Sequence, residues 1–446
     1  MDWDSLSVFF FIFSIALIAV FFGYAAIVSL LEKEMRAFTV FLVSTLIFSF
    51  LLFLVYATIV PWYLFIAADM VLIVAILLFF LPFKNGFSNA ENPLMRIDER
   101  IIMFSRSRLI PGSKRYRDYY DEFPEHLDND RQFRNLPGLL SSEAPFFDEK
   151  YFYAALNNFS TVETLHNLVD GPFVERESEV DPSEVTNFIS SWVEKMGAHS
   201  NGVTKLHDYH KYSIVGRGDD YGKKVELDHT YAFAFTVEMD KNLMDAAPMA
   251  PVVFESSQQY LRSGLIAVQV AEWIRSLGYD ARAHIDGNYR VVCPLIARDA
   301  GLGEIGRMGL LMTPRLGPRV RIAVVTTNMP LQVSKRLPDP SVDAFCDVCK
   351  KCAITCPSAA IPKDQKQEID GILRWQIDQE KCYTYWCRVG TDCGKCMRLC
   401  PYSHPDNFLH NVVRYGIKRS HLFRKFAVRM DDFVYGKNPK PRLPKV

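Results

Sequence analysis

Nine of the ten cysteines of this 446-residue chain lie between positions 346 and 400, and eight of them form two runs. The runs are Cys346-x2-Cys349-x2-Cys352-x3-Cys356-Pro357 and Cys382-x10-Cys393-x2-Cys396-x3-Cys400-Pro401. The spacing C-x2-C-x2-C-x3-C-P is typical of two 4Fe–4S clusters, in which the fourth cysteine of each run ligates the other cluster. Two-residue gaps allow one tight loop to direct three thiolates at one cluster. The pattern therefore predicts one cluster on Cys346, Cys349, Cys352 and Cys400, and a second on Cys382, Cys393, Cys396 and Cys356.

Other uses of the cysteines fit the pattern less well. Zinc sites usually combine two separated pairs of ligands and do not require this run. Disulfide frameworks are typical of small secreted domains rather than of a chain of this length. Within the second run, Cys387 is an alternative ligand to Cys382. Cys293, in Val-Val-Cys-Pro, is expected to be a small buried hydrophobic residue.

The beginning of the chain is apolar and predicts membrane attachment. Residues 7–31, 37–60 and 64–81 form three apolar stretches, and about 20 apolar residues cross a bilayer. The acidic start Met-Asp-Trp-Asp and the repeated stretches indicate permanent helices rather than a cleaved signal peptide. Lysine and arginine occur between the first two stretches, at Lys33 and Arg36, and again over residues 84–108. This bias places the soluble part on the cytoplasmic side of the cytoplasmic membrane.

Two features of these regions leave alternatives open. Asp69, near the start of the third stretch, either reaches toward the membrane surface or takes part in proton or quinol chemistry. Residues 1–83 contain no histidine, so this anchor lacks the usual ligands of b-type haem.

The tail from Arg414 onward carries ten lysines and arginines against Asp431 and Asp432. Such a tail fits anionic lipid, with solvent or nucleic acid as the alternatives.

The middle of the chain predicts a connecting region followed by an α/β domain. Residues 84–175 show few periodic runs, whereas a capped helix is expected to follow Asp181 and to end at Gly197. A second helix is expected over 257–277 and strands over 231–239, 290–296 and 321–328. About 160 residues of this kind can bury a core of their own. We expect this domain to hold the group that the clusters reduce.

A glycine-rich segment lies between the last two predicted strands. Gly301-x-Gly303-x-x-Gly306 matches the letters of a dinucleotide-binding fingerprint, but it lacks the βαβ context and the later acid that this motif requires. Because glycines allow close approach of the backbone, the segment instead predicts contact with another large cofactor.

Several longer motifs then resemble one family. They are Phe345-Cys346 with its run, Cys382-Tyr383-x2-Trp386 leading to Asp392-Cys393-Gly394-x-Cys396, Ala300-Gly-Leu-Gly-Glu-x-Gly-Arg307-x-Gly-Leu-Leu-Met-Thr-Pro314, and Gly317-Pro-Arg-Val-Arg321. Over roughly residues 140–410 the chain resembles the cobalamin-dependent reductive dehalogenases and the related epoxyqueuosine reductases. The resemblance implies a nitroreductase-like α/β core that holds a corrinoid, fused to a ferredoxin-like two-cluster module. It also favours Cys382 over Cys387 as a ligand.

The residue patterns and the resemblance together predict an α+β chain in five parts, of which the fused N-terminal anchor departs from the usual members of this family. These are a transmembrane anchor of three helices (1–83), a connecting region (84–175), the corrinoid-binding core (176–340), the two-cluster module (341–405) and a basic tail (406–446). Gly301, Gly303, Glu304 and Gly306 would contact the corrinoid, which this family binds with its lower base detached and without a protein ligand to cobalt.

The resemblance also implies a reaction. Electrons pass through the clusters to Co(I), the halide leaves, and the carbon receives a proton from Tyr260. Arg307 would stabilise the phenolate, and Asn288 is a third candidate. Structural roles remain open: Tyr260 can be a packing residue with Tyr289 as its competitor, Arg307 can pair with Glu304, and Asn288 can be a turn residue.

We therefore expect a membrane-anchored corrinoid and iron–sulfur reductase that acts on an organohalide. Its electron donor would be reduced ferredoxin, a flavoprotein or quinol. One alternative is reduction of another substrate such as an epoxide, although a membrane anchor suits a tRNA substrate poorly. A second alternative is a non-catalytic electron-transfer protein without corrinoid. The chain has 51 basic and 51 acidic residues, and we expect no nucleic-acid partner.

Overall fold

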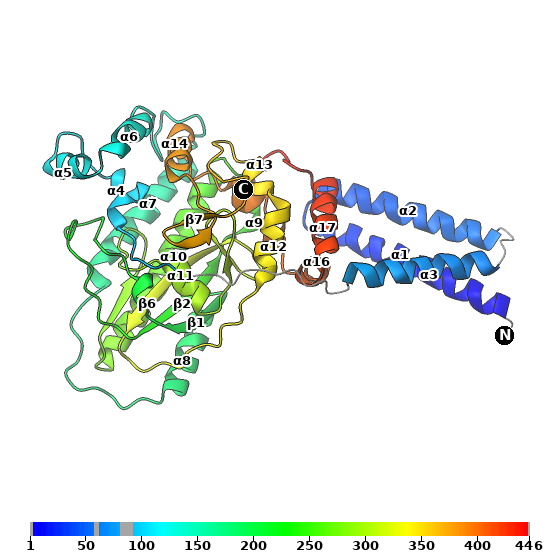
Figure 1. Cartoon of the computed structure of the whole chain (residues 1–446), viewed down its shortest axis with the longest axis horizontal. Helices are drawn as coiled ribbons and strands as arrows, with labels where there is room; N and C mark the ends of the chain where they lie inside the picture. Colours follow the sequence, from blue (N-terminus) through cyan, green and yellow to red (C-terminus); the bar gives the residue numbers. More distant parts are fainter. Residues whose placement is uncertain (1–2, 58–61, 81–91, 445–446) are drawn as a thin grey trace. The chain divides into compact units, whose positions relative to one another are not determined.

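The computed structural model describes residues 3–57, 62–80 and 92–444 (Figure 1). The chain divides into two compact units. One unit consists of Met1–Gly86 and Asp406–Pro439, and the other of Phe87–Pro405 and Lys440–Val446. The predicted boundary between residues 83 and 84 lies outside the described residues.

The first unit is helical throughout its described part. Its helices are α1 (Trp3–Leu31), α2 (Met35–Ala57), α3 (Trp62–Phe80), α16 (Phe408–Arg419) and α17 (His421–Val434). Among the described residues, Val8–Leu31 and Met35–Val55 are long and apolar enough to cross a membrane. The third predicted span is not supported, because the apolar described part of α3, Tyr63–Val74, is shorter than the roughly 20 residues that a bilayer requires. Residue 81, its predicted end, lies outside the described residues.

The segment predicted as a basic tail contains the helices α16 and α17. Leu409 and Ile417 are buried in α16, as are Phe423 and Val434 in α17. Leu409 and Val434 join a buried cluster with residues of α1 and α2. The segment is therefore folded and belongs to the same unit as the N-terminal helices, because apolar residues recur between its bases at helical spacing.

The second unit is built around an antiparallel sheet in the order β1-β2-β6-β3. Its strands are β1 (Ser200–Lys205), β2 (Tyr231–Glu238), β3 (Ala281–His284) and β6 (Val320–Thr327). Alternating residues of β2 enter different clusters, as the two-residue period of a strand requires. Phe233 and Phe235 pack with α7 (Glu149–Leu165), α8 (Pro182–Lys195) and α10 (Pro251–Ser276). Ala232 and Ala234 pack with α11 (Cys293–Asp299).

Most predicted elements of this core are confirmed, with two differences. The strands over 231–239 and 321–328 and the helix after Asp181 are present as β2, β6 and α8. The predicted strand over 290–296 is wrong, because Pro294 lies in the first turn of α11. A short apolar run suits either a strand or a helix, and a proline in the first turn suits a helix. Helix α10 begins at Pro251 rather than at 257, so Tyr260 lies inside the helix rather than at its start.

Shorter elements connect this core to the cysteine-rich segment. The described part of the predicted connecting region, residues 92–175, contains helices and belongs to the second unit. The remaining described α-helices and strands are α4 (Met103–Arg106), α5 (Lys114–Glu122), α6 (Leu127–Arg134), α9 (Lys241–Met244), α12 (Pro340–Cys349), α13 (Lys351–Ile354), α14 (Gln379–Val389), α15 (Lys395–Arg398), β4 (Glu304–Ile305), β5 (Leu311–Met312), β7 (Gln367–Ile369) and β8 (Ile372–Arg374).

Arg106 joins the connecting region to the cysteine-rich segment. Its side chain is fully buried and donates to Asp130 at 2.9 and 2.5 Å and to Glu380 of α14 at 2.7 Å. We predict that Arg106→Ala lowers the free energy of unfolding by roughly 3–5 kcal/mol, because Asp130 is left buried without its cation. Arg131→Ala, which removes an exposed pair with Asp128, is the control and should cost less than about 1 kcal/mol. Denaturant unfolding followed by circular dichroism measures both, and equal losses would contradict the prediction.

Candidate active site and metal centres

The structure brings the predicted cysteine sets together. The thiol of Cys400 lies within electrostatic range of Cys346, Cys349 and Cys352, which with it are called the first cysteine set. The thiol of Cys396 lies within range of Cys356, Cys382 and Cys393, the second cysteine set, and also of Cys352. The two sets are therefore neighbours. Lys350, in the left-handed conformation at φ 52°, separates α12 from α13 and forms the tight turn between Cys349 and Cys352.

The chemistry of these donors suits an iron–sulfur cluster. Burial raises the pKa of the Cys346 thiol to about 11 and those of Cys382 and Cys393 to about 12. Bound iron would therefore release their protons, because thiolates are the ligands. Among the described residues, no group of three or more potential ligands converges on a single metal ion. A cluster is larger than a single ion and accommodates more widely spaced thiolates.

The two remaining cysteines lie in other surroundings. Cys387 is buried in a hydrophobic cluster with Met103 and Phe133. Cys293 is buried at the wall of a cavity of about 200 Å³. Because Cys382 lies beside the other members of the second set and Cys387 has an apolar environment, the geometry favours Cys382 as the ligand.

A central cavity of about 650 Å³ lies within the second unit. All four cysteines of the second set line it, together with apolar side chains of the connecting region, α7 and the segment after β4. The first set is not among its described lining residues. The second set is therefore the one next to the cavity.

Tyr260 and Arg321 form a pair on the wall of this cavity. The guanidinium carbon of Arg321 lies 4.7 Å from the centre of the Tyr260 ring. Burial raises the pKa of the Tyr260 phenol, and the nearby Arg321 cation opposes that rise. The phenol therefore keeps its proton at neutral pH, and the Arg321 cation can stabilise the phenolate that forms when the proton leaves.

Polar contacts position Arg321. Its Nη2 lies 2.5 Å from Ser256 Oγ and 3.2 Å from the Asp392 carboxylate. Ser256 also donates to Asp392, which precedes the cysteine-set member Cys393. The Nε of Arg321 has no hydrogen-bond partner among the described residues. This buried donor, on the wall of the cavity, fits a polar group of a bound molecule.

Arg307 lies elsewhere, and this corrects the predicted pairing with Tyr260. Its Nε donates to the Cys346 carbonyl at 3.0 Å and its Nη1 to the Pro362 and Asp364 carbonyls at 2.9 and 2.7 Å. Its guanidinium lies 4.2 Å from the centre of the Trp375 ring. Arg307 therefore stabilises the loops around the first cysteine set, and Arg321 is the cation beside Tyr260.

The glycine-rich segment also packs against protein rather than against the central cavity. A Cβ at Gly303 would lie 2.2 Å from the Met312 carbonyl oxygen, and one at Gly306 would lie 2.8 Å from the Met312 side chain. Gly301 adopts a φ of +83° in the turn before them. These glycines permit the close β4–β5 pairing. The described lining of the cavity includes the residues that follow, 308–310, and does not include the three glycines.

Glu304 and Asn288 make structural contacts. Glu304 accepts from Arg336 at 3.1 Å and from the Asp339 amide at 3.0 Å, so its cation is Arg336 rather than Arg307. Asn288 accepts from Arg282 at 2.6 Å and is not among the described residues that line the central cavity.

Two lining residues were missed by the sequence reasoning. Asp286, two positions before Asn288, lines the central cavity, and Arg217 lies beside it on the same wall. Arg217 pairs with the buried Glu99 at 2.8 Å. The Asp286-Gly-Asn turn is the only sequence feature that points to Asp286 as a cavity residue. No sequence motif around Arg217 predicts that it lines the cavity.

Known iron–sulfur proteins and reductive dehalogenases are similar to this chain. A family model described as a 4Fe-4S dicluster domain matches residues 345–404. The tetrachloroethene reductive dehalogenase of Sulfurospirillum multivorans is 31% identical over 294 residues, which cover 57% of this chain and 58% of the relative. The chain is homologous to reductive dehalogenases. The predicted resemblance to reductive dehalogenases is thereby confirmed.

The homology has defined limits. The chain spans about half the length of the dehalogenases it matches. An epoxyqueuosine reductase of Lactococcus garvieae is 28% identical over 150 residues, covering 31% of this chain and 40% of the relative. The solved catabolic reductive dehalogenase NpRdhA, in complex with 3-bromo-4-hydroxybenzoic acid, is 22% identical with a TM-score of 0.63. That match covers 79% of this chain and 48% of the other, and it shows a shared mixed α/β fold.

Proposed function

We propose that this protein is a membrane-anchored reductive dehalogenase that contains a corrinoid and two 4Fe–4S clusters. One observation carries the proposal. The second cysteine set and the Tyr260–Arg321 pair line the same cavity, so an electron source and a proton source face one space. The dehalogenase relatives supply the substrate class, an organohalide.

The central cavity has a mostly apolar wall with a polar side, which fits the macrocycle of a large cofactor and its polar groups. Its described apolar wall includes Leu139, Leu140, Phe159, Met308 and Leu310. The donor Nε of Arg321 and the second cysteine set lie on its polar side. When bound, the corrinoid supplies a strongly reducing cobalt centre and the clusters supply one-electron relays. A detached lower base remains a prediction, as do Gly301, Gly303, Glu304 and Gly306 as corrinoid contacts, and the packing of those four residues does not favour contact.

Tyr260 supplies the proton in this proposal. Replacement of a halogen by hydrogen consumes two electrons and one proton and releases halide. The protonated Tyr260 donates to the carbon, and Arg321 stabilises the phenolate that remains. Asp392 and Ser256 hold the guanidinium over the ring and so act as positioning residues.

Electrons are proposed to arrive from the first cysteine set. Only the second set lines the cavity among the described residues, and Cys352 and Cys396 join the two sets. The donor remains reduced ferredoxin, a flavoprotein or quinol. Two candidate spans, α1 and α2, would anchor the protein, with Lys33 between them and Arg36 in the first turn of α2 on the cytoplasmic side. One oxygen of Asp69 in α3 is buried without a hydrogen-bond partner among the described residues.

Metal analysis tests the proposal directly. The full-length protein is purified anaerobically with supplied cobalamin, and iron, sulfide, cobalt and halide release from chlorinated and brominated substrates are measured. We expect about eight iron per chain, as two cubanes require, about one cobalt, and halide release that depends on a reductant. Iron without cobalt would support the electron-transfer alternative. If an epoxide assayed in parallel is reduced and no halide is released from the organohalides, the epoxide alternative is supported.

Substitution of Arg321 and of Arg307 should have different effects on the rate and on the iron content. Arg321→Met should lower kcat about 10²–10³-fold with iron content unchanged, because the cation beside the reacting phenol is lost. Arg307→Met should instead lower the iron content, because three carbonyls around the first cysteine set lose their donor. Metal analysis and initial rates of both variants are compared. The reverse pattern would restore Arg307 as the active-site cation.

A further inference from the structure

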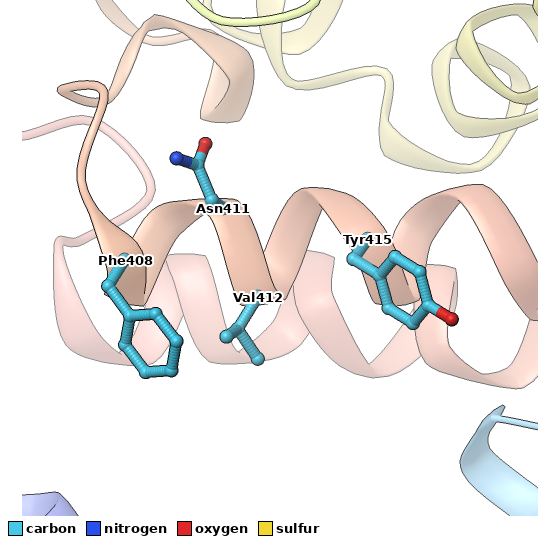
Figure 2. A pocket seen from close by; sticks show the side chains of 4 residues that line it. All are labelled: Phe408, Asn411, Val412 and Tyr415. Carbon is cyan, nitrogen blue, oxygen red and sulfur yellow. The ribbon is translucent and has the colours of Figure 1, made fainter.

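Helices α16 and α17 each carry a second apolar stripe that is exposed. Phe408, Val412 and Tyr415 follow one another along one side of α16 (Figure 2), and they line an open groove of about 440 Å³ together with Asn411. Phe408 is 64% exposed and Tyr415 52%. Spacings of four and three residues place all three on one helix face. This face is distinct from the one that Leu409 and Ile417 bury.

A corresponding exposed stripe lies on α17, and bases flank both stripes. Leu422, Phe426 and Phe433 are 48%, 43% and 57% exposed, and their spacings of four and seven residues place them on one face of α17. Residues 408–430 contain no acid, and their bases are Arg414, Lys418, Arg419, Arg424, Lys425 and Arg429. The guanidinium of Arg419 lies 5.1 Å from the centre of the Tyr415 ring. Exposed aromatic residues with flanking bases and no acids are typical of helices that lie in a membrane surface rich in anionic lipid.

Contacts within the first unit fix the depth of α16. The rings of Phe408 and Tyr24 are 6.2 Å apart. Tyr24 lies seven residues before Leu31, the end of α1, which is about 10 Å along the helix. When α1 spans the bilayer, a side chain beside Tyr24 therefore lies at the level of lipid.

Polar contacts hold the helix pair at the same end of the α1–α2 hairpin. Asn407 donates to Glu32 at 2.6 Å, and His410 lies 3.1 Å from the same carboxylate. Arg36 donates through Nε to the Phe433 carbonyl at 3.1 Å. These residues flank Lys33, on the side where basic residues mark the cytoplasmic leaflet.

We propose that α16 and α17 form an interfacial anchor, with the exposed stripe in the boundary between headgroups and acyl chains and the bases on anionic headgroups. The inference rests on the proposed membrane attachment of α1 and α2. It assigns the basic C-terminal segment a lipid partner and makes it a second, peripheral attachment of the enzyme.

Photo-crosslinking of the full chain in lipid nanodiscs tests this anchor. The residue p-benzoylphenylalanine, which inserts into nearby C–H bonds, replaces one residue at a time, and mass spectrometry identifies the adduct. The test positions are Tyr415 and Phe426. Phe13, 52% exposed on α1, reports span insertion, and Phe188, 51% exposed in the second unit, is the aqueous control. Nanodiscs contain phosphatidylcholine with or without phosphatidylglycerol.

The expected result is lipid adducts at Phe13, Tyr415 and Phe426, and none at Phe188. Lys425→Glu with Arg429→Glu should reduce the adduct yield at Tyr415 by about fivefold or more in phosphatidylglycerol nanodiscs only, since each base near an anionic surface contributes about fivefold to binding. Adducts at Phe13 but not at Tyr415 and Phe426 would overturn the interfacial anchor and leave the spans intact. Adducts of Tyr415 or Phe426 to a second copy or to the second unit would also overturn it. No adduct at Phe13 would overturn both the spans and the anchor.

Discussion

Tyr260→Phe lowers the rate of dehalogenation by about 10²–10⁴-fold and leaves the iron, sulfide and cobalt contents unchanged. The magnitude is that of a positioned general acid. The phenol sits on the cavity wall under Arg321, and phenylalanine keeps the ring and its packing while removing the only proton it can donate. Initial rates of halide release, together with metal analysis of the same preparation, measure the effect.

Tyr289→Phe is the matched control for this substitution. Tyr289 and Tyr260 both line the cavity of about 200 Å³ that also contacts Cys293. Tyr289 is not among the described residues that line the central cavity. We expect its rate to stay within a few-fold of the natural protein. If Tyr289→Phe abolishes turnover and Tyr260→Phe does not, the proton donor is Tyr289.

The pH dependence of the rate provides a third readout. Burial raises the pKa of Tyr260, so the acid is protonated at neutral pH and activity falls only as pH rises through that pKa. Arg321 lowers the same pKa, because a cation favours the phenolate. In Arg321→Met the alkaline fall should therefore move to still higher pH, on top of the lower maximum rate.

Cys382→Ala lowers the iron content from about eight to about four per chain and abolishes turnover. The expected loss is complete because the second cysteine set is the one next to the cavity. Cys387→Ala, in the same helix, is the control and should retain the full iron content and most of the activity, since Cys387 packs among Met103 and Phe133. Iron analysis and electron paramagnetic resonance of the reduced proteins measure both. Iron loss in Cys387→Ala alone would exchange the two roles.

Some of this site was readable from the sequence because its signals are local. Cluster ligands follow one another at fixed spacing, so the pattern groups the cysteines before any fold is known. The family resemblance predicts Tyr260 as the proton donor, and its motif Gly317-Pro-Arg-Val-Arg321 contains Arg321. The choice between Arg307 and Arg321 depended on which arginine faces α10. That is decided by the pairing of β6 with β2, between residues more than 80 positions apart in the chain.

The remaining differences have the same physical origin. The glycines near Gly303 have the composition of a cofactor loop, and only the position of Met312 shows that protein fills the space. In α16 and α17 two apolar stripes alternate with bases, so the average composition resembles a solvated tail. Burial of Leu409 and Val434 against α1 and α2 distinguishes the two, and that contact joins residues almost 400 positions apart.

The first unit joins Met1–Gly86 to Asp406–Pro439, and this has a consequence for the order of assembly during synthesis. The ribosome delivers α1 and α2 first, and more than 300 residues follow before α16 appears. During that interval Glu32 lacks its hydrogen-bond partners Asn407 and His410. The buried alanines of the α1–α2 hairpin likewise lack their contact with Leu409. If the proposed spans α1 and α2 insert as they are made, a nascent chain interrupted in the cluster module would be attached to the membrane without the helices that complete this unit. The first unit is therefore complete only after the segment Phe87–Pro405 of the second unit has been synthesised.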